Sequence, residues 1–499
     1  MNVKQTKSVK ILFLAVALLC LCGVSFAQNT NETTIDEEEG INQYGVRVKS
    51  YPLQAKAQNE ILVLQNKEKG YKFWMDNRVQ FDGAHYFGLK NGMIPAGSEE
   101  PAMPGGVSLR RVRMAVKAEI AHNWYGEVDV NFANGVFELE DAYIMFIGLK
   151  GFEFKAGNFK EDFSMEQTTT SRYTTFMERP MIVATFAPSR HAGIQANWIQ
   201  FPWIRASAGV SWQIVDTWQT RYNVEEINKE GGGMGTNVAW KAVFMPWGAK
   251  PYHGLHLGYN GSFRDARKVD DNLEDLNAIT TRGYGGDYYS TRNSTAVNRT
   301  KFIRTEFYGV KHDWLHGFEL AGYKDGFRFQ GEYMMNYTVM DEDLKYSNWY
   351  RSGAETNMET KMFNGFYIQA CYLLFGGKNR YDVTQSEFTQ PTRGKSWGDI
   401  EVMARFDYIN LNSEDLRKGS GLRGGAGQNI ALGVVYHINN NVKFMVNYQY
   451  SQNDIYAGNR GRAAIGKDVN GDYTTNPLDA VSDIGIRFNT LQARIEIAF

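Results

Sequence analysis

The chain has 499 residues and a formal net charge of −1; 14% of its residues are aromatic, and it has 50 glycines but only 11 prolines. This composition favours many strands and turns over helices, and the even charge balance gives no case for a nucleic-acid partner. A mean hydropathy of −0.43 is unlike that of a helical membrane protein.

Residues 1–27 have the features of a secretory signal peptide. Three lysines precede an apolar run over residues 11–22, which is too short to span a bilayer as a helix. Small residues at Ser25 and Ala27 place the cleavage site before Gln28. The remaining chain has one cysteine, Cys371, and no apolar run of about 18 residues or more. We therefore expect an exported protein that is held together without disulfides and without spanning helices.

Residues 28–70 are polar and include the acidic run 36–39. We interpret this segment as a mobile periplasmic leader, with one short helix near residues 59–67. From residue 71 to the end of the chain the pattern changes to strict alternation of apolar and polar residues. Val112, Met114 and Val116 share one face of a segment whose other face has Arg111 and Arg113. This period of two predicts strands with one apolar and one polar face.

Two features favour a membrane barrel over a soluble sandwich, which would show the same period. The apolar faces often end in Tyr, Trp or Phe, as lipid-facing strands do at membrane interfaces. The connections also alternate between short turns and long loops. Short turns lie at 121–123, 148–151, 201–203, 324–326 and 439–441, and long loops at 83–108, 158–189, 214–236, 265–315, 340–362 and 451–490. A closed sheet also pairs every backbone polar group inside a bilayer.

The prediction is an all-β fold, a 16-stranded antiparallel transmembrane β-barrel over residues 71–499. Its strands start near residues 71, 109, 124, 138, 152, 190, 204, 237, 254, 317, 327, 363, 396, 428, 442 and 491. Eighteen strands result if residues 301–311 add more. Residues 376–395 do not fit, because about twenty residues fall on the short-turn, periplasmic side. The last strand alternates throughout and ends in Phe499, which resembles the signal that the bacterial barrel-assembly machinery reads.

The third loop, between strands that begin near residues 152 and 190, is the best candidate for an inward-folded constriction. It is about thirty residues long and rich in both charges. Its basic residues, with the one that opens the next strand, are Lys160, Arg172, Arg179 and Arg190, and its acidic residues are Glu161, Asp162, Glu166 and Glu178. For Arg172 and Arg179 we favour ion pairs that pin the loop over direct contact with a solute.

The block 109–198 resembles the phosphate-selective porin O and P family. The matching pieces are 110–113, 131–135, 139–143, 157–161, 171–179 and 186–190 through Gly193, with later pieces at 329–334, 367–370 and 444–448. The resemblance implies a sixteen-stranded, usually trimeric porin of the bacterial outer membrane, in contact with its lipid, with a basic pore that favours anions such as phosphate.

Within this family, the preference for phosphate is attributed to a row of arginines and lysines that line the pore. Arg111, Arg113 and Lys117 form the densest like-charge row here, and neighbours on one strand face lie roughly 6–7 Å apart, close enough to pass an anion along. The alternative is that each pairs with a lumen acid such as Glu119 or Asp129. Lys155 and Arg205 also fall on polar faces, as do several acids, and mixed charges of this kind are typical of general, non-selective porins.

We find no catalytic, cofactor or metal motif. Residues 394–396 end like a phosphate-binding loop but Thr389 stands where its first glycine belongs, and residues 468–472 resemble a calcium loop without the closing glutamate. The function predicted is a passive outer-membrane porin for small anions. The alternatives are a general diffusion pore, or a barrel that serves as a surface-binding or structural protein with its lumen closed by loops.

Overall fold

The computed structural model describes residues 38–58, 61–90, 103–212, 235–248, 250–265, 288–306, 310–340, 360–413, 422–454, 456–457, 466–470, 472–474 and 487–499. The predicted signal peptide 1–27 lies outside these residues. The chain divides into two compact units, residues 1–54 and 55–499. In the first, β1 (Glu38–Ile41) and β2 (Arg47–Ser50) pair as a small antiparallel hairpin.

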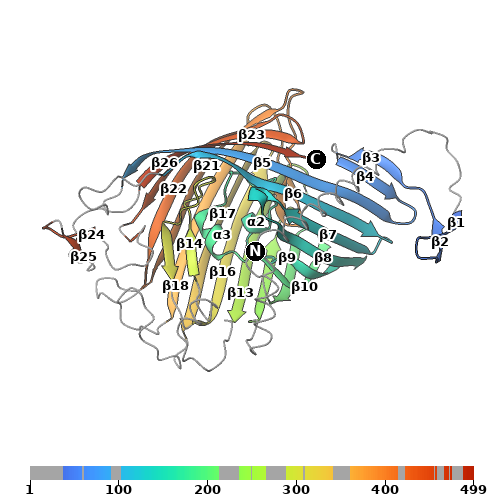
Figure 1. Ribbon diagram of the computed structural model, residues 1–499, viewed down its shortest axis with the longest axis horizontal. Helices are drawn as coiled ribbons and strands as arrows, with labels where there is room; N and C mark the ends of the chain where they lie inside the picture. The colour runs from blue at the N-terminus through green and yellow to red at the C-terminus, as the bar shows by residue number, and fades with distance from the viewer. Residues whose placement is uncertain are drawn as a thin grey trace, which may run out of the picture. The chain divides into compact units, whose positions relative to one another are not determined.

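The second unit is a closed antiparallel barrel of sixteen strands, sealed where β26 pairs with β5 (Figure 1). The strands, each pairing with the next, are β5 (Tyr71–Lys90), β6 (Gly106–Ile120), β7 (Trp124–Asn131), β8 (Glu138–Leu149), β9 (Phe152–Lys160), β10 (Arg190–Phe201), β11 (Ile204–Ser211), β12 (Asn237–Phe244), β13 (His253–Asp265), β16 (Val310–Lys324), β17 (Phe327–Met340), β18 (Lys361–Leu373), β21 (Asp399–Ser413), β22 (Leu422–His437), β23 (Val442–Asn453) and β26 (Arg487–Ala498). The sixteen-strand prediction is confirmed.

The eighteen-strand alternative is wrong. β15 (Ile303–Glu306) pairs with β14 (Tyr288–Thr291) as a separate two-stranded sheet and adds nothing to the barrel. Two extra strands, β3 (Gln54–Gln58) and β4 (Ile61–Asn66), join the sheet beside the start of β5. The last small pair is β24 (Gly466–Lys467) with β25 (Tyr473–Thr474).

The short helix expected near residues 59–67 is also wrong, because those residues include β4. Val63 lies opposite Trp74 and Asn66 opposite Tyr71, so β4 pairs with the first residues of β5. The other edge of β5 is already bonded to β6. A strand satisfies the N–H and C=O groups of the free edge of β5, which a helix does not.

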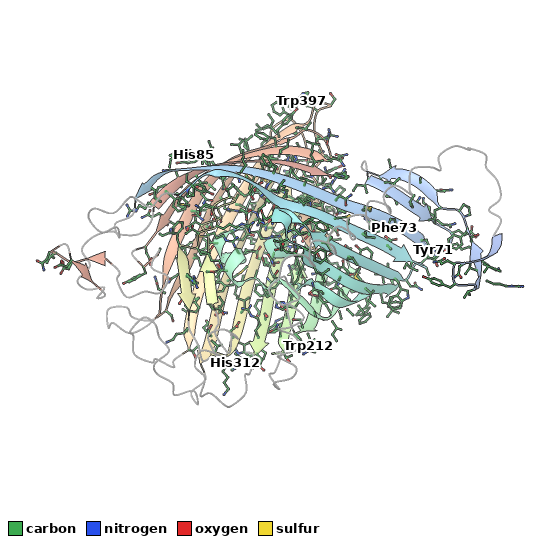
Figure 2. The ribbon with its side chains drawn as sticks, viewed as in Figure 1. Tyr71, Phe73, His85, Trp212, His312 and Trp397 are labelled. Atoms are coloured by element: carbon green, nitrogen blue, oxygen red, sulfur yellow. The ribbon has the colours of Figure 1, made fainter. Side chains whose placement is uncertain are left out.

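Alternation decides which way each side chain points. On β22, Ile430, Leu432 and Val434 point outward and are 51%, 55% and 44% exposed, whereas inward-facing Ala431 is 1% exposed. Figure 2 shows side chains on both faces of the wall, with Trp397 at one end of the barrel and Trp212 and His312 at the other. None of the helices in the described ranges is long and apolar enough to cross a membrane.

Three segments fold into the barrel and fill much of it. The first is the constriction loop, residues 161–189, with α2 (Met165–Thr168) and α3 (Met181–Phe186); Figure 1 draws both helices within the circle of strands. Apart from these segments, a short 3-10 helix, η1 (Ala133–Gly135), lies between β7 and β8. The second segment contains β14 and β15. The third is the inner hairpin, β19 (Arg380–Asp382) and β20 (Glu387–Thr389).

The inward segments pack on each other and on the wall. Ile182 and Phe186 of α3 belong to one buried cluster with Tyr289 of β14 and Phe363 of β18. Met165 of α2 packs with Phe388 of the inner hairpin in a second cluster. The inner hairpin explains why residues 376–395 did not fit as a short turn: the connection turns into the barrel and meets the constriction loop.

Candidate pore constriction

Exposure of the inward-facing side chains differs around the barrel. Much of the inward faces of β10 to β26 lies under the three inward segments. Four long cations there are at most 5% exposed: Lys241, Arg328, Arg405 and Arg494. The inward faces of β6 to β9 and of the first residues of β5 keep partly exposed side chains, as at Lys117, Glu127, Glu140, Tyr143 and Lys155. The open part of the interior therefore lies against β5 to β9.

The constriction loop turns one polar face toward this open side. Gln167, Thr168, Thr170, Tyr173, Glu178 and Arg179 are partly exposed, while most of the loop's other residues are buried. Glu178 crosses to the wall, where its carboxylate accepts two hydrogen bonds from Arg110, at 2.6 and 3.0 Å. Burial opposes ionisation of Glu178, but the Arg110 guanidinium outweighs it and holds the pKa of this carboxyl below its ordinary value. Arg494 lies 3.4 Å from the same carboxylate.

Arg179 holds the loop's own backbone. Its guanidinium donates to the carbonyls of Glu166, Gln167 and Thr169 at 2.9, 3.3 and 2.9 Å. Lys160 donates to the Gln167 carbonyl at 3.0 Å. These carbonyls lie at the end of α2 and have no intrahelical partners. Burial, with the nearby Arg113 and Arg190, lowers the pKa of Arg179 against the opposing effect of Glu166, yet an arginine stays charged in proteins.

The wall opposite the loop has paired charges. Arg113 contacts Glu140 and lies 3.5 Å from Asp129. Arg190 lies 2.5 Å from Glu140 and 2.7 Å from Asp141. Asp129, Glu140 and Asp141 of this wall therefore each have a guanidinium partner.

The remaining predicted site residues are spread over the interior. Lys117 lies 3.4 Å from Asp76 and 3.3 Å from Glu127, Arg172 lies 3.5 Å from Asp76, and Arg205 lies 2.5 Å from Asp162. Arg111 donates to the Gln80 side chain at 2.8 Å, and the Lys155 ammonium lies 4.7 Å from the Tyr143 ring centroid. Among the described residues, no ion pair within 4.0 Å joins a carboxylate to four of the nine: Arg111, Lys155, Lys160 and Arg179.

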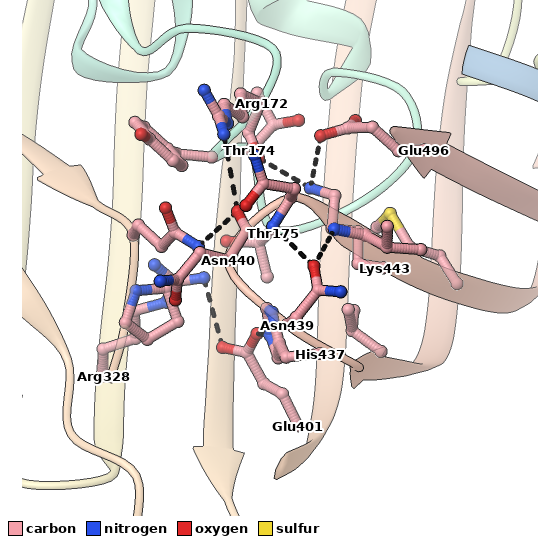
Figure 3. A pocket seen from close by; sticks show the side chains of 17 residues that line it. Arg172, Thr174, Thr175, Arg328, Glu401, His437, Asn439, Asn440, Lys443 and Glu496 are labelled. Carbon is pink, nitrogen blue, oxygen red and sulfur yellow. Dashed lines mark hydrogen bonds and ion pairs between the residues drawn. The ribbon is translucent and has the colours of Figure 1, made fainter. Parts of the chain in front are cut away.

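At the short-turn end, the base of the constriction loop borders a pocket (Figure 3). Lys443 donates to the Arg172 carbonyl at 2.6 Å and lies 3.5 Å from Glu496. Arg328 lies 3.1 Å from Glu401 across the pocket. The cations of this pocket are therefore engaged with acids or backbone, which anchors the loop rather than leaving a charge free.

Two residues of the constriction were missed by alternation. Arg110 and Glu140 both sit at β-bulges. Gln80 pairs with Arg111 and Phe81 with Leu109, which leaves Arg110 as the extra residue of β6. In the same way, Asp129 pairs with Asp141 and Val130 with Leu139, which leaves Glu140 as the extra residue of β8. A bulge redirects a side chain that alternation would send outward. The available signal was the charged doublets 110–111 and 140–141 within strands, since strict alternation sends one member of such a doublet into lipid.

A sixteen-stranded barrel with lipid-facing apolar residues and a charged loop across its interior defines an outer-membrane porin. The model of the phosphate-selective porin O and P family matches residues 102–471, and the chain belongs to this family. It is similar to Porin O of Pseudomonas aeruginosa, with 25% identity over 421 residues that cover 80% of this chain and 87% of that protein.

Solved structures are similar at lower identity. The outer-membrane expressed OmpT of Vibrio cholerae matches with 12% identity and a TM-score of 0.45, covering 88% of this chain and 100% of that chain. The outer membrane channel DcaP of Acinetobacter baumannii matches with 10% identity and a TM-score of 0.45, covering 87% of this chain and 99% of that chain. The chain is a passive porin of the bacterial outer membrane.

Proposed function

We propose that this porin favours small anions, phosphate among them, and that the selection occurs between the constriction loop and β6 to β9. The observation that supports the proposal is an imbalance of partners. The facing carboxylates Glu140, Asp141 and Glu178 each have a guanidinium partner. Arg111, Lys155, Lys160 and Arg179 instead contact neutral groups.

Unpaired cations in a narrow aqueous path lower the energy of a passing anion and raise that of a cation. Two loop carboxylates lie near Arg179. Glu178 is held by Arg110, and Glu166 is 1% exposed beneath the loop. Burial raises the pKa of Glu166, although Arg179 opposes the shift. The Glu166 carboxylate accepts hydrogen bonds from the side chains of Gln330 and Gln369, at 3.1 and 3.2 Å.

Reversal potentials of single channels in a KCl gradient test this proposal. We expect chloride to be favoured over potassium, and added phosphate to reduce the chloride current by occupying the constriction. A preference for potassium would remove the anion claim. Equal permeability to chloride and potassium would favour the general diffusion pore. The pairing of Arg113 and Lys117 with acids supports that alternative, because a paired cation attracts a passing anion less.

A closed barrel with a structural or surface-binding role is the second alternative, and the filling of the interior by three segments favours it. Liposome swelling separates the two. Purified protein that swells liposomes in small sugars or salts has an open path, and protein that folds but never swells them does not.

We also propose two partners. A homotrimer is expected from the family, and cross-linking of the protein in outer membranes tests it. The barrel-assembly machinery is expected to read β26 and Phe499. Phe499 exchanges backbone hydrogen bonds with Asn77 of β5, at 3.0 and 2.7 Å, so the last residue closes the barrel. Deletion of Phe499 should lower the amount of assembled porin.

A further inference from the structure

Four aromatic side chains form a continuous row on the inner wall. Trp74 of β5 and Tyr125 of β7 have ring centroids 6.0 Å apart, Tyr125 and Tyr143 of β8 are 5.9 Å apart, and Tyr143 and Phe159 of β9 are 6.2 Å apart. Each spacing lies in the range of direct aromatic contact. We call these four residues the aromatic row.

The row faces the water path and not the lipid. Trp74 lies opposite Lys117 across the β5–β6 ladder, and Tyr143 lies opposite Glu127 across the β7–β8 ladder. Directly opposed residues point to the same face of a sheet, and Lys117 and Glu127 are the lumen pair already described. Trp74, Tyr125 and Tyr143 are partly exposed, while Phe159 is 3% exposed and supports the edge of Tyr143.

The row also climbs along the barrel. Trp74 lies near the start of β5 and Tyr125 near the start of β7, both at the short-turn end. Tyr143 lies in the middle of β8. Phe159 is the last residue but one of β9, directly before the constriction loop. The row therefore leads from the short-turn end of the open path to the constriction.

Lysines accompany the rings. The Lys72 ammonium lies 4.3 Å from the Trp74 ring centroid, and the Lys155 ammonium lies 4.7 Å from that of Tyr143 and 5.2 Å from that of Phe159. Lys72 is also 3.4 Å from Glu119, but both side chains of that pair are about a third exposed, at 32% and 38%, where an ion pair holds weakly.

One acid is shared by the two tyrosines and fixes their edges. The Glu127 carboxylate accepts hydrogen bonds from the hydroxyls of Tyr125 and Tyr143, at 2.6 and 2.9 Å. Lys117 lies 3.3 Å from the same carboxylate and neutralises it locally. The two tyrosine rings are thus held in place by their hydroxyl groups, and both side chains remain partly exposed to the interior.

We propose that the aromatic row is a binding track for anions that contain a flat-faced ring, such as sugar phosphates or aryl phosphates. The ring of the solute stacks on Trp74, Tyr125 or Tyr143 while its anionic group is held by Lys72 or Lys155. This inference rests on the proposed anion preference and names a substrate class for it: inorganic phosphate uses the cations alone, and a ring-bearing phosphate uses both.

Current block in planar bilayers tests the track. Phenyl phosphate, glucose 6-phosphate and inorganic phosphate are each added to the wild-type channel, to Tyr143→Leu and to Tyr143→Phe. We expect both ring-bearing anions to block wild type at lower concentration than inorganic phosphate. Tyr143→Leu should weaken their block by at least about fivefold, the lower end of what stacking on one aromatic ring contributes, and should leave the block by inorganic phosphate within about twofold.

Two variants distinguish the ring from other effects. Tyr143→Phe keeps the ring and removes the hydroxyl, so block by ring-bearing anions should stay close to wild type. Tyr333→Leu removes an outward-facing ring that is 38% exposed on β17 and should change nothing. Trp74→Leu is a second site on the row and should repeat the Tyr143→Leu result if that variant assembles poorly.

The outcomes separate the two proposals. A wild-type channel that favours chloride but is blocked equally by all three phosphates overturns the track and leaves the proposed anion preference standing. A wild-type channel that favours potassium overturns the anion preference and the track with it. Block by phenyl phosphate alone assigns the track to aryl anions, and block by glucose 6-phosphate alone assigns it to sugar phosphates.

Discussion

Neutralising Arg179 should reduce anion preference more than any other single change in the constriction loop. Arg179 faces the open side. Among the described residues, its guanidinium donates to backbone carbonyls alone, and it lies across from Glu140 and Asp141, which are paired with Arg190. A unit charge about 6 Å from a passing ion contributes about 0.7 kcal/mol at a dielectric constant of 80 and about 2.8 kcal/mol at 20. The lower value applies to a water-filled path.

Arg179→Gln should therefore lower the ratio of chloride to potassium permeability by at least about threefold, since about 1.4 kcal/mol corresponds to tenfold. Arg179→Lys is the matched control, because it keeps the charge and loses the planar fork that binds three carbonyls. Reversal potentials in a KCl gradient measure both variants. If the lysine variant loses as much selectivity as the glutamine variant, the residue acts by holding the loop and the electrostatic reasoning fails.

Three further predictions concern stability, each measured by thermal unfolding of the purified barrel. Because the pKa of Glu178 is held below its ordinary value, its ionised form stabilises the fold above about pH 4.3, and this stabilisation is lost as pH falls. Glu178→Gln should lower the free energy of unfolding by about 1–3 kcal/mol at pH 7. An equal effect of this variant in acid would contradict the assignment. Burial raises the pKa of Glu387 in the inner hairpin to about 7, with Lys160 opposing. The neutral carboxyl is therefore favoured and stability is lost as pH rises from about 4.3 to that value, so Glu387→Gln should raise Tm at pH 8 more than at pH 5, and identical shifts at both would refute this. The Asp399 carboxylate accepts four backbone N–H groups at 2.8–3.0 Å at the base of the inner hairpin. Asp399→Ala should cost about 1–3 kcal/mol and Asp399→Asn less; an unchanged Tm for the alanine variant would show that water replaces the carboxylate.

The position of the inner hairpin could not be predicted from the sequence. Its length was visible as a long connection on the side of the short turns. Its position was not, because the contacts that hold it join residues far apart in the chain. Tyr381 is hydrogen-bonded to His256 at 2.5 Å, and Phe388 packs on Met165. Neither partner can be identified from alternation, which reports only the face to which a side chain belongs.

The bulges at Arg110 and Glu140 show the same limit at the constriction. Alternation assigned Arg111 and Arg113 to the inner face but sent Arg110 outward. The register shift that reverses it arises from pairing between two strands and is decided by the neighbour as much as by the strand itself. Which cations are paired likewise depended on distances across the lumen, as for Arg190 with Glu140 and Asp141.

The sequence by itself determined the barrel, its sixteen strands and the loop between β9 and β10, because a period-two pattern and the order of short and long connections are local properties of the chain. Only the tertiary structure decided which part of the interior stays open. Three segments cover the inner faces of β10 to β26 through contacts between distant residues, and the water path, its unpaired cations and its aromatic row remain along β5 to β9. The physical reason is that alternation fixes on which side of a closed sheet a residue lies, whereas burial on that side depends on which loop folds over it.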